Sequence, residues 1–122
     1  MKSAHFDVEP DGFYGAYWKS EQPSDCALIA MLGDDPEDYL ARSAVKWMIR
    51  QGINVMTMSP AKKDYGHHNY PLERIETAIR WLKAHGNRKI GIVGASTTGT
   101  LALTAASYFP ELTLTIAMTP SD

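Results

Sequence analysis

Residues 89–110, KIGIVGASTTGTLALTAASYFP, join a short apolar run to a segment rich in Ala and Leu. The first six residues have the length and composition of a buried strand, and TTGTLALTAASYF (97–109) has those of a helix. Between them lies a turn with the sequence GASTTG, residues 94–99. A turn of this kind between a strand and a helix is compatible with a nucleophilic serine, a dinucleotide-binding turn or a simple helix cap.

The rest of the chain alternates between apolar runs of strand length and amphipathic segments. CALIAML (26–32), INVMTM (53–58) and LTLTIAM (112–118) are typical of strands that are buried on both faces of a parallel sheet. Helices are predicted within 33–52 and 71–86, where apolar residues recur at helical spacing. This strict alternation predicts an α/β fold with three layers, in which helices cover both faces of a mostly parallel sheet.

The first of these helices has recognisable end signals. Asp34 or Asp35 is predicted to cap it, Pro36 to occupy its first position and Gly52 to follow its end. Its apolar stripe is expected to consist of Leu40, Ala44, Trp47 and Met48.

The N-terminal segment HFDVEPDGFYGAYWKS (5–20) alternates loosely around two glycines. It predicts a pair of strands that are joined by a turn at Pro10-Asp11-Gly12. His5 in this segment and His85 after the second helix are expected to be surface residues.

Composition places the chain among ordinary globular proteins. It has 122 residues, a formal net charge of −2 and 44% hydrophobic residues, so no basic excess indicates a nucleic-acid partner. Its apolar runs are far shorter than the roughly 18 residues of a membrane span, and residues 1–7 lack the apolar core of a signal peptide. Cys26 is the only cysteine, which excludes an internal disulfide. We therefore expect a cytoplasmic protein that does not span a membrane.

The last predicted strand, at 112–118, has no helix after it to cover it. Because a doubly wound sheet usually continues with further helices, we interpret residues 1–122 as the N-terminal portion of a single larger domain. The expected protein partner is the C-terminal half of that domain, or a second copy in a self-associating dimer.

Three interpretations of the 94–99 turn remain open from its own residues. Ser96 has Gly94 two positions before it, as in the nucleophile motif G-x-S-x-G, but Thr98 occupies the second glycine position. A dinucleotide turn would need a relaxed glycine pattern, with Asp122 near the ribose. A serine cap at the start of a helix is the third interpretation. The position after two strand–helix units favours the nucleophile turn.

A longer pattern surrounds this turn. It consists of CALIAMLGDD, a helix ending in QGINVMTM, a Trp-Leu pair late in the second helix, and GASTTG followed by ASYFP and a strand. Over residues 26–122 the chain resembles the N-terminal half of the catalytic domain of the acyl-CoA thioesterase and bile acid-CoA:amino acid N-acyltransferase family. The members of this family are α/β-hydrolases related to dienelactone hydrolases.

The resemblance implies that Ser96 is the catalytic nucleophile and that the N–H of Thr97 is one donor of the oxyanion hole. The loop LGDDP would supply the other donor, from Asp34 next to Gly33. Because acyltransferring members often carry cysteine at the nucleophile position, Ser96 favours hydrolysis of an ester or thioester, with acyl-CoA thioesters as expected substrates. This chemistry needs no metal and no organic cofactor.

The resemblance leaves the partners of the serine outside the chain, because in this fold the acid and the histidine follow the nucleophile. His67 and His68 precede Ser96 in a polar loop, where a solvated role is the more frequent explanation than that of a base. The loop segment AKKD (61–64) could meet the phosphates of a CoA-like substrate or be simply solvated. A non-catalytic fragment or pseudoenzyme is therefore also compatible with the sequence.

Overall fold

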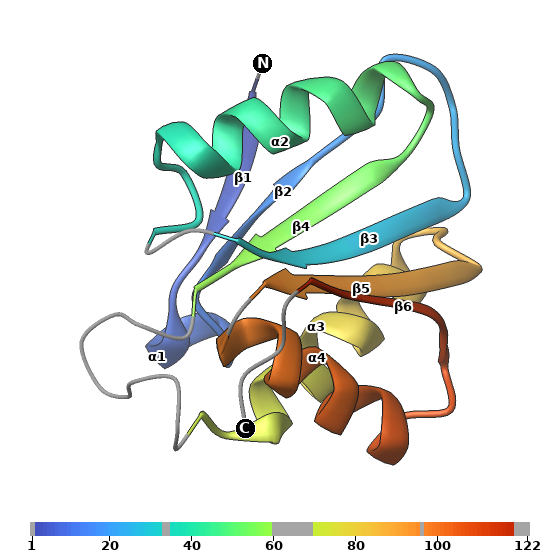
Figure 1. Ribbon diagram of the computed structural model, residues 1–122. Helices are drawn as coiled ribbons and strands as arrows, with labels where there is room; N and C mark the ends of the chain where they lie inside the picture. The colour runs from blue at the N-terminus through green and yellow to red at the C-terminus, as the bar shows by residue number, and fades with distance from the viewer. Residues whose placement is uncertain (1, 33–34, 60–69, 96, 119–122) are drawn as a thin grey trace.

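The computed structural model describes residues 2–32, 35–59, 70–95 and 97–118, and these form one sheet with helices on both faces (Figure 1). The strands of this part are β1 (Ser3–Phe6), β2 (Gly15–Trp18), β3 (Cys26–Met31), β4 (Asn54–Met58), β5 (Lys89–Ala95) and β6 (Leu112–Met118). The helices are α1 (Val8–Asp11), α2 (Tyr39–Arg50), α3 (Leu72–Ala84) and α4 (Thr97–Tyr108).

The strands lie in the order β1-β2-β4-β3-β5-β6. From β4 to β6 all neighbouring strands are parallel, while β1 and β2 form an antiparallel hairpin that joins β4 on the other edge. Helices α2, α3 and α4 connect the four parallel strands in chain order. The predicted α/β fold with a mostly parallel sheet is therefore confirmed.

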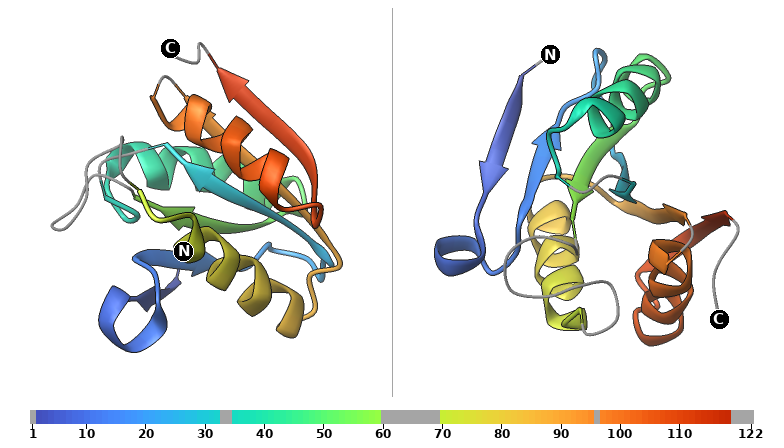
Figure 2. Two further views of the ribbon diagram at one scale, coloured as in Figure 1. Left: turned by 90° about the horizontal axis from the view of Figure 1, so that it is seen from below. Right: turned by 60° about the vertical axis from the view of Figure 1, so that its left-hand side comes forward.

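Helix α2 covers one face of the sheet, while α3 and α4 lie on the other, which gives three layers (Figure 2). The larger core fills the space under α3 and α4. Its completely buried members include Ile29, Met56, Ile75, Leu82 and Ile92. The smaller core lies under α2 and contains Trp18, Val45, Val55 and Val93. Apolar residues on both faces of β3, β4 and β5 account for their nearly continuous apolar sequences.

The N-terminal strands form as predicted, but their connection is not a simple turn. Residues Val8–Asp11 make one helical turn, which ends at Gly12 with a positive φ of 87°. Glycine adopts this left-handed conformation without the steric penalty that a Cβ would add.

Helix α2 begins later than the end signals in its sequence predict. Its N-cap is Asp38, whose side chain accepts a hydrogen bond from the backbone N–H of Ala41 at 2.9 Å. Asp35 instead accepts from the N–H of Glu37 at 2.9 Å, so it stabilises a turn before the helix, and Pro36 lies in this turn. The predicted cap at Asp35 and the predicted helical position of Pro36 are therefore wrong.

The apolar stripe of α2 is also displaced from the predicted one. The helix buries Ala41, Val45, Met48 and Ile49. Of the predicted stripe only Met48 is buried, while Leu40 and Trp47 are 57% and 64% exposed. Arg42 lies over the ring of Trp18 in β2, so the flank with Leu40 and Trp47 is turned away from β2.

One apolar face of strand β6 is not covered by any helix in the described ranges. Leu114 and Ile116 pair with Gly91 and Val93 of β5 and share the α2 side of the sheet with Val93. They are 53% and 41% exposed, because α2 covers the β2, β4 and β3 part of this face and does not extend to β6.

Two buried asparagines connect the amino ends of the strands. Asn54 donates to the carbonyl of Ser24 at 3.1 Å and to Asn87 Oδ1 at 2.8 Å, and it accepts from the N–H of Ser20 at 2.8 Å. Asn87 in turn donates to the hydroxyl of Tyr17 at 3.2 Å. Each contact satisfies a polar group that burial would otherwise leave without a partner.

We predict that Asn87→Ala lowers the free energy of unfolding by about 1–3 kcal/mol, because it leaves a buried amide of Asn54 without its acceptor. Urea unfolding measures this change. The neighbouring substitution Arg88→Ala, at a side chain that is 83% exposed, is the control and should change stability by less than about 0.5 kcal/mol. Equal effects of the two substitutions would contradict the structural role of Asn87.

Candidate active site

The 94–99 turn lies at the carboxyl edge of the sheet, where β3 and β5 end side by side. The parallel register pairs Met31 at the end of β3 with Gly94 near the end of β5. In the sequence Gly33 and Asp34 closely follow Met31, and Ser96 closely follows Gly94. Helices α2 and α4 then leave toward opposite faces of the sheet (Figure 1). Such a divergence between neighbouring strands is the usual place for a ligand site in α/β folds.

The strand-to-helix turn is tight at Gly94. A Cβ at this position would overlap the carbonyl oxygen of Thr98 and lie 2.6 Å from the carbonyl carbon of Thr98 and 3.0 Å from the nitrogen of Gly99. Only glycine permits this approach of β5 to the first turn of α4. The first glycine of the motif is therefore required by the geometry.

Thr98 occupies the second glycine position of the motif, and its side chain is accommodated by turning toward Ala95. The hydroxyl of Thr98 donates to the carbonyl of Ala95 at 2.7 Å and accepts from the N–H of Ala95 at 2.8 Å. The residue is buried, with 5% of its surface exposed. These two bonds connect the end of β5 to the start of α4 across the position of Ser96.

Thr97 is the first residue of α4. The first N–H groups of a helix have no acceptor within the helix, and they lie at the positive end of its dipole. The backbone of Thr97 is thus suited to hold a negatively charged oxygen. The other predicted site residues lie outside the described residues: Ser96, Gly33, Asp34, the alternative base candidates His67 and His68, the AKKD segment and Asp122.

The turn at 35–38, next to the predicted oxyanion loop, is held by side chains that no sequence motif singled out. Thr57 donates to the carbonyl of Pro36 at 2.6 Å, and Tyr14 donates to Asp35 at 3.0 Å. Burial, together with the hydrogen bond to Asp35, raises the pKa of Tyr14 to about 12. The Tyr14 hydroxyl therefore keeps its proton for this bond at neutral pH.

Tyr70 lies just before α3, at the carboxyl edge that carries the candidate site. Its side chain is buried, and among the described residues its hydroxyl has no hydrogen-bond partner. Burial raises the pKa of Tyr70, and the nearby guanidinium of Arg74, 5.8 Å from the ring centroid, reduces this shift. The hydroxyl is a neutral donor.

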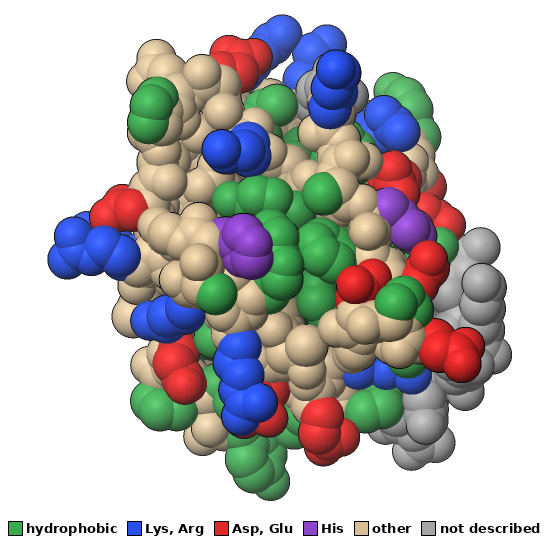
Figure 3. Space-filling model, turned by 180° about the vertical axis from the view of Figure 1, so that it is seen from behind, with side chains coloured by type: hydrophobic (Ala, Val, Ile, Leu, Met, Phe, Trp, Pro, Cys, Tyr) green, Lys and Arg blue, Asp and Glu red, His purple; other side chains and the backbone are tan. Residues whose placement is uncertain are grey.

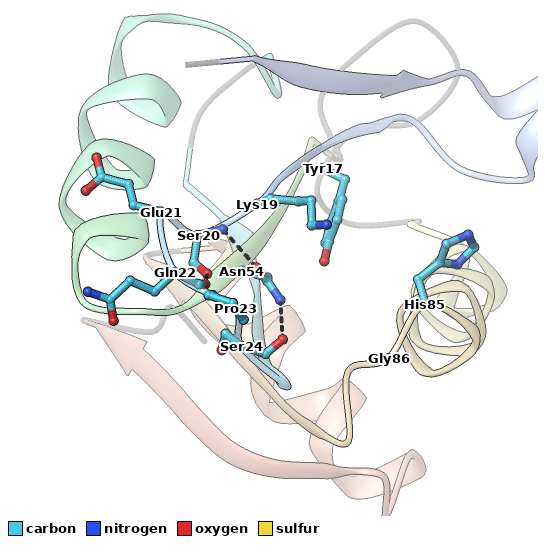
Figure 4. Close-up of a pocket in the computed structure, with 10 residues that line it drawn as sticks. All are labelled: Tyr17, Lys19, Ser20, Glu21, Gln22, Pro23, Ser24, Asn54, His85 and Gly86. Atoms are coloured by element: carbon cyan, nitrogen blue, oxygen red, sulfur yellow. Dashed lines mark hydrogen bonds between the residues drawn. The ribbon is translucent and has the colours of Figure 1, made fainter.

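A hollow of about 480 Å³ lies at the opposite, amino edge of the sheet (Figure 4). Lys19, Tyr17 and His85 lie around it, and Asn54 in its wall is bonded to Ser20 and Ser24. The buried amide of Asn54 is therefore already paired within the protein. Ligands of α/β folds bind at the carboxyl edge, which favours the 94–99 turn over this hollow.

None of the helices in the described residues is long and apolar enough to cross a bilayer. Within the same ranges, no three or more His, Cys, Asp or Glu side chains are grouped so that they could hold a metal ion.

No protein-family model and no curated protein matches the sequence. Among solved structures, an esterase from Pyrococcus furiosus is 19% identical with a TM-score of 0.72, over 98% of this chain and 48% of that protein. The α/β hydrolase GrgF from Penicillium sp. is 24% identical with a TM-score of 0.77, over 98% and 45%. A cold-adapted esterase from an Arctic intertidal metagenomic library is 18% identical with a TM-score of 0.74, over 93% and 58%.

These similarities show that the chain has the α/β-hydrolase fold. The chain spans about half the length of the solved structures that it matches. At these sequence identities the comparison establishes the fold and not the activity.

We predict that Thr98→Val destabilises the protein by about 1–3 kcal/mol, because it preserves the side-chain shape but leaves the partly buried N–H of Ala95 without its acceptor. Thr98→Ser keeps the hydroxyl and should cost less than about 1 kcal/mol, through the loss of one methyl group. Urea unfolding of both variants distinguishes the two effects. If the valine variant is as stable as the serine variant, the hydrogen bonds to Ala95 do not hold the turn.

Proposed function

We propose that this chain provides the nucleophile-bearing part of a serine hydrolase that acts on an ester or thioester. Ser96 Oγ attacks the carbonyl carbon, the alcohol or thiol leaves, and water then hydrolyses the acyl-serine intermediate. The observation that carries this proposal is the approach of Gly94 to the backbone of Thr98 at the carboxyl edge of the sheet. A turn this tight is the geometry that presents a nucleophile in α/β-hydrolases.

Two backbone donors are proposed for the oxyanion that forms during the attack. One is the N–H of Thr97, which begins α4, and the other is the N–H of Asp34, next to Gly33. The pairing of Met31 with Gly94 supports this assignment, because the segments that carry both donors leave neighbouring strands at the same level. Donors fixed in advance stabilise the developing charge without reorganising in the transition state.

The proton of Ser96 needs a base, and that base needs an acid to orient it. In α/β-hydrolases both residues follow the nucleophile along the chain. We therefore assign the Asp and the His to a segment of a complete domain that this sequence does not contain. The matched hydrolases are longer than this chain, which spans 45–58% of their length.

Our more specific proposal for the substrate is an acyl-CoA thioester. Support comes from the sequence resemblance over 26–122 and from serine in place of the cysteine that is frequent in acyltransferring members. The esterases among the matched structures support the broader class, an ester hydrolase. The experiment compares the rates at which the complete domain hydrolyses p-nitrophenyl esters and acyl-CoA thioesters. Faster hydrolysis of the thioesters supports the specific substrate, and faster hydrolysis of the esters supports only the broader class.

The dinucleotide-binding interpretation has less support. A dinucleotide fingerprint normally follows the first strand of its domain, whereas this turn follows β5, and the fold matches that of α/β-hydrolases. Measurable NAD or NADP binding by calorimetry would favour the dinucleotide interpretation.

We predict that a fluorophosphonate probe labels Ser96 covalently when the remainder of the domain is present. Ser96→Ala should abolish labelling and reduce ester turnover by at least roughly 10³-fold, because the nucleophile is lost. Mass spectrometry of the labelled peptide identifies the modified serine.

The matched control is Ser107→Ala, at an exposed serine of α4 whose hydroxyl donates to the carbonyl of Thr104 at 2.8 Å. Its labelling should equal that of the unmodified protein. Absence of labelling in the complete domain, or labelling that survives Ser96→Ala, would exclude Ser96 as the nucleophile.

We further propose that the exposed apolar face of β6 is covered in the complete protein by the remainder of the domain or, without it, by a second copy of this chain. Leu114, Ile116 and Met118 lie on this face and are each 41–53% exposed, and β6 is an edge strand of the sheet. Exposed apolar edges of this kind favour association.

The prediction is that the 122-residue chain alone associates and that Ile116→Lys shifts it toward the monomer, because a charge on this face is costly to bury. Multi-angle light scattering measures the mass. Thr113→Lys adds the same charge to an exposed position of the same strand and should leave association unchanged. A monodisperse monomer of the unmodified chain would contradict this proposal.

A further inference from the structure

Strand β1 contributes two side chains that bind one carboxylate. Ser3 Oγ donates to Glu37 Oε2 at 2.8 Å, and His5 Nδ1 lies 2.8 Å from Glu37 Oε1. Glu37 belongs to the 35–38 turn, which directly follows the proposed oxyanion residues in the sequence. The N-terminal hairpin therefore makes side-chain contacts with the described end of the loop that leads from β3 to α2.

His5 lies between two carboxylates. Its Nδ1 contacts Glu37, and its Nε2 lies 3.1 Å from Asp7 Oδ1. An ionised carboxylate only accepts hydrogen bonds, and a neutral imidazole has only one N–H. Both contacts can be hydrogen bonds at once only if His5 is protonated. The bridge to Glu37 and Asp7 is therefore specific for the imidazolium form.

The surroundings of His5 are mainly acidic. Figure 3 shows both described histidines on one face of the molecule, with acidic side chains gathered near one of them. The ring of Tyr14 meets the His5 ring edge to face, with the centroids 5.6 Å apart. In the part of the chain that the structure describes, the titratable and charged groups that face His5 or the carboxylates it binds are Asp7, Asp11, Tyr14, Asp35, Glu37 and Arg42.

The protonated form is favoured by these contacts. Partial burial lowers the pKa of His5, but hydrogen bonds to Glu37 and Asp7 and their negative charges raise it by more, to above its ordinary value of 6.5. A raised pKa in the folded state means that the bridge stabilises fully below pH 6.5 and is lost as the pH rises through the folded-state pKa. Because His5 and Asp7 are 42% and 54% exposed, solvent screening keeps the effect modest.

The backbone of the 35–38 turn is also hydrogen-bonded to β4 and α2. The carbonyl of Pro36 accepts from Thr57 of β4 at 2.6 Å, and Arg42 Nε of α2 donates to the carbonyl of Glu37 at 2.9 Å. Asp38 caps α2. The Glu37 side chain thus adds a contact with β1 to a turn whose backbone is bonded to β4 and α2.

We propose that His5 is a positioning residue of the candidate active site: its protonated form holds the 35–38 turn, which directly follows the proposed oxyanion residues in the sequence. This inference rests on the proposed function and adds a regulatory feature to the same site. Loss of the His5 proton releases one carboxylate contact and lowers the rate of attack by Ser96, while substrate binding is little changed.

The structural part of the test uses NMR on the complete protein. The His5 imidazole should titrate with a midpoint above 6.5, and the amide of Glu37 should shift with the same midpoint. His5→Gln removes the titrating group and should abolish the response at Glu37. His85→Gln, at a histidine whose ring stacks on Trp81 and lies 2.8 Å from the carbonyl of Trp81, is the matched control and should preserve it. A His5 midpoint at or below 6.5, or an unresponsive Glu37 amide, would overturn the bridge.

The functional part compares the rate of fluorophosphonate labelling at Ser96 across pH. Below pH 6.5 the unmodified protein should react about two- to fivefold faster than His5→Gln, and the ratio should approach one above the His5 pKa. In ester hydrolysis the difference should appear in kcat and not in KM. His85→Gln should match the unmodified protein at every pH.

The outcomes separate this inference from the proposed function. Robust labelling with identical pH profiles in His5→Gln and the unmodified protein keeps the hydrolase and overturns the positioning role. An unlabelled Ser96 together with coupled NMR titrations removes the catalytic function, and with it the role of His5 in catalysis, but leaves the pH-dependent bridge established.

Discussion

The parallel pairing of β3 with β5 is the interaction on which the rest of the structure depends. It places the ends of both strands at the same level, with Met31 opposite Gly94, and from there α2 and α4 leave toward opposite faces. This divergence of neighbouring connections is a consequence of the topology, and ligands of α/β folds bind where it occurs. The glycine at 94 then permits the approach of α4 to the strand, so that the turn between them is tight.

Thr98 shows which part of the nucleophile motif is a steric requirement in this chain. The crowding at Gly94 involves the backbone of Thr98, and not its side chain. A side chain at the second glycine position is therefore tolerated if it turns away from the strand, and here it bonds to both backbone groups of Ala95. In place of a second glycine, this chain has a threonine whose hydroxyl connects the end of β5 to the first turn of α4.

Much of the fold was predictable, because the parallel strands are continuous apolar runs and β6 coincides with LTLTIAM. Helix α2 shows where the periodicity is insufficient. The stripes Leu40-Ala44-Trp47 and Ala41-Val45-Met48 both repeat at helical spacing and differ by a rotation of about 100° around the axis. Only packing against β2 and β4 selects the second stripe. The same packing leaves Leu40 and Trp47 exposed, and the cap of the helix is Asp38 rather than Asp35.

The sequence by itself determined the order of the four parallel strands and the three helices between them, the α/β class and the position of the glycine turn after the strand 89–94. The tertiary structure alone decided which distant side chains meet. Ser3 and Glu37 are 34 residues apart, Tyr14 and Asp35 are 21 apart, and Asn54 and Asn87 are 33 apart. Local apolar periodicity indicates which face of a helix or strand is buried. A hydrogen bond between distant residues depends on how whole elements pack together, and no periodic sequence pattern predicts it.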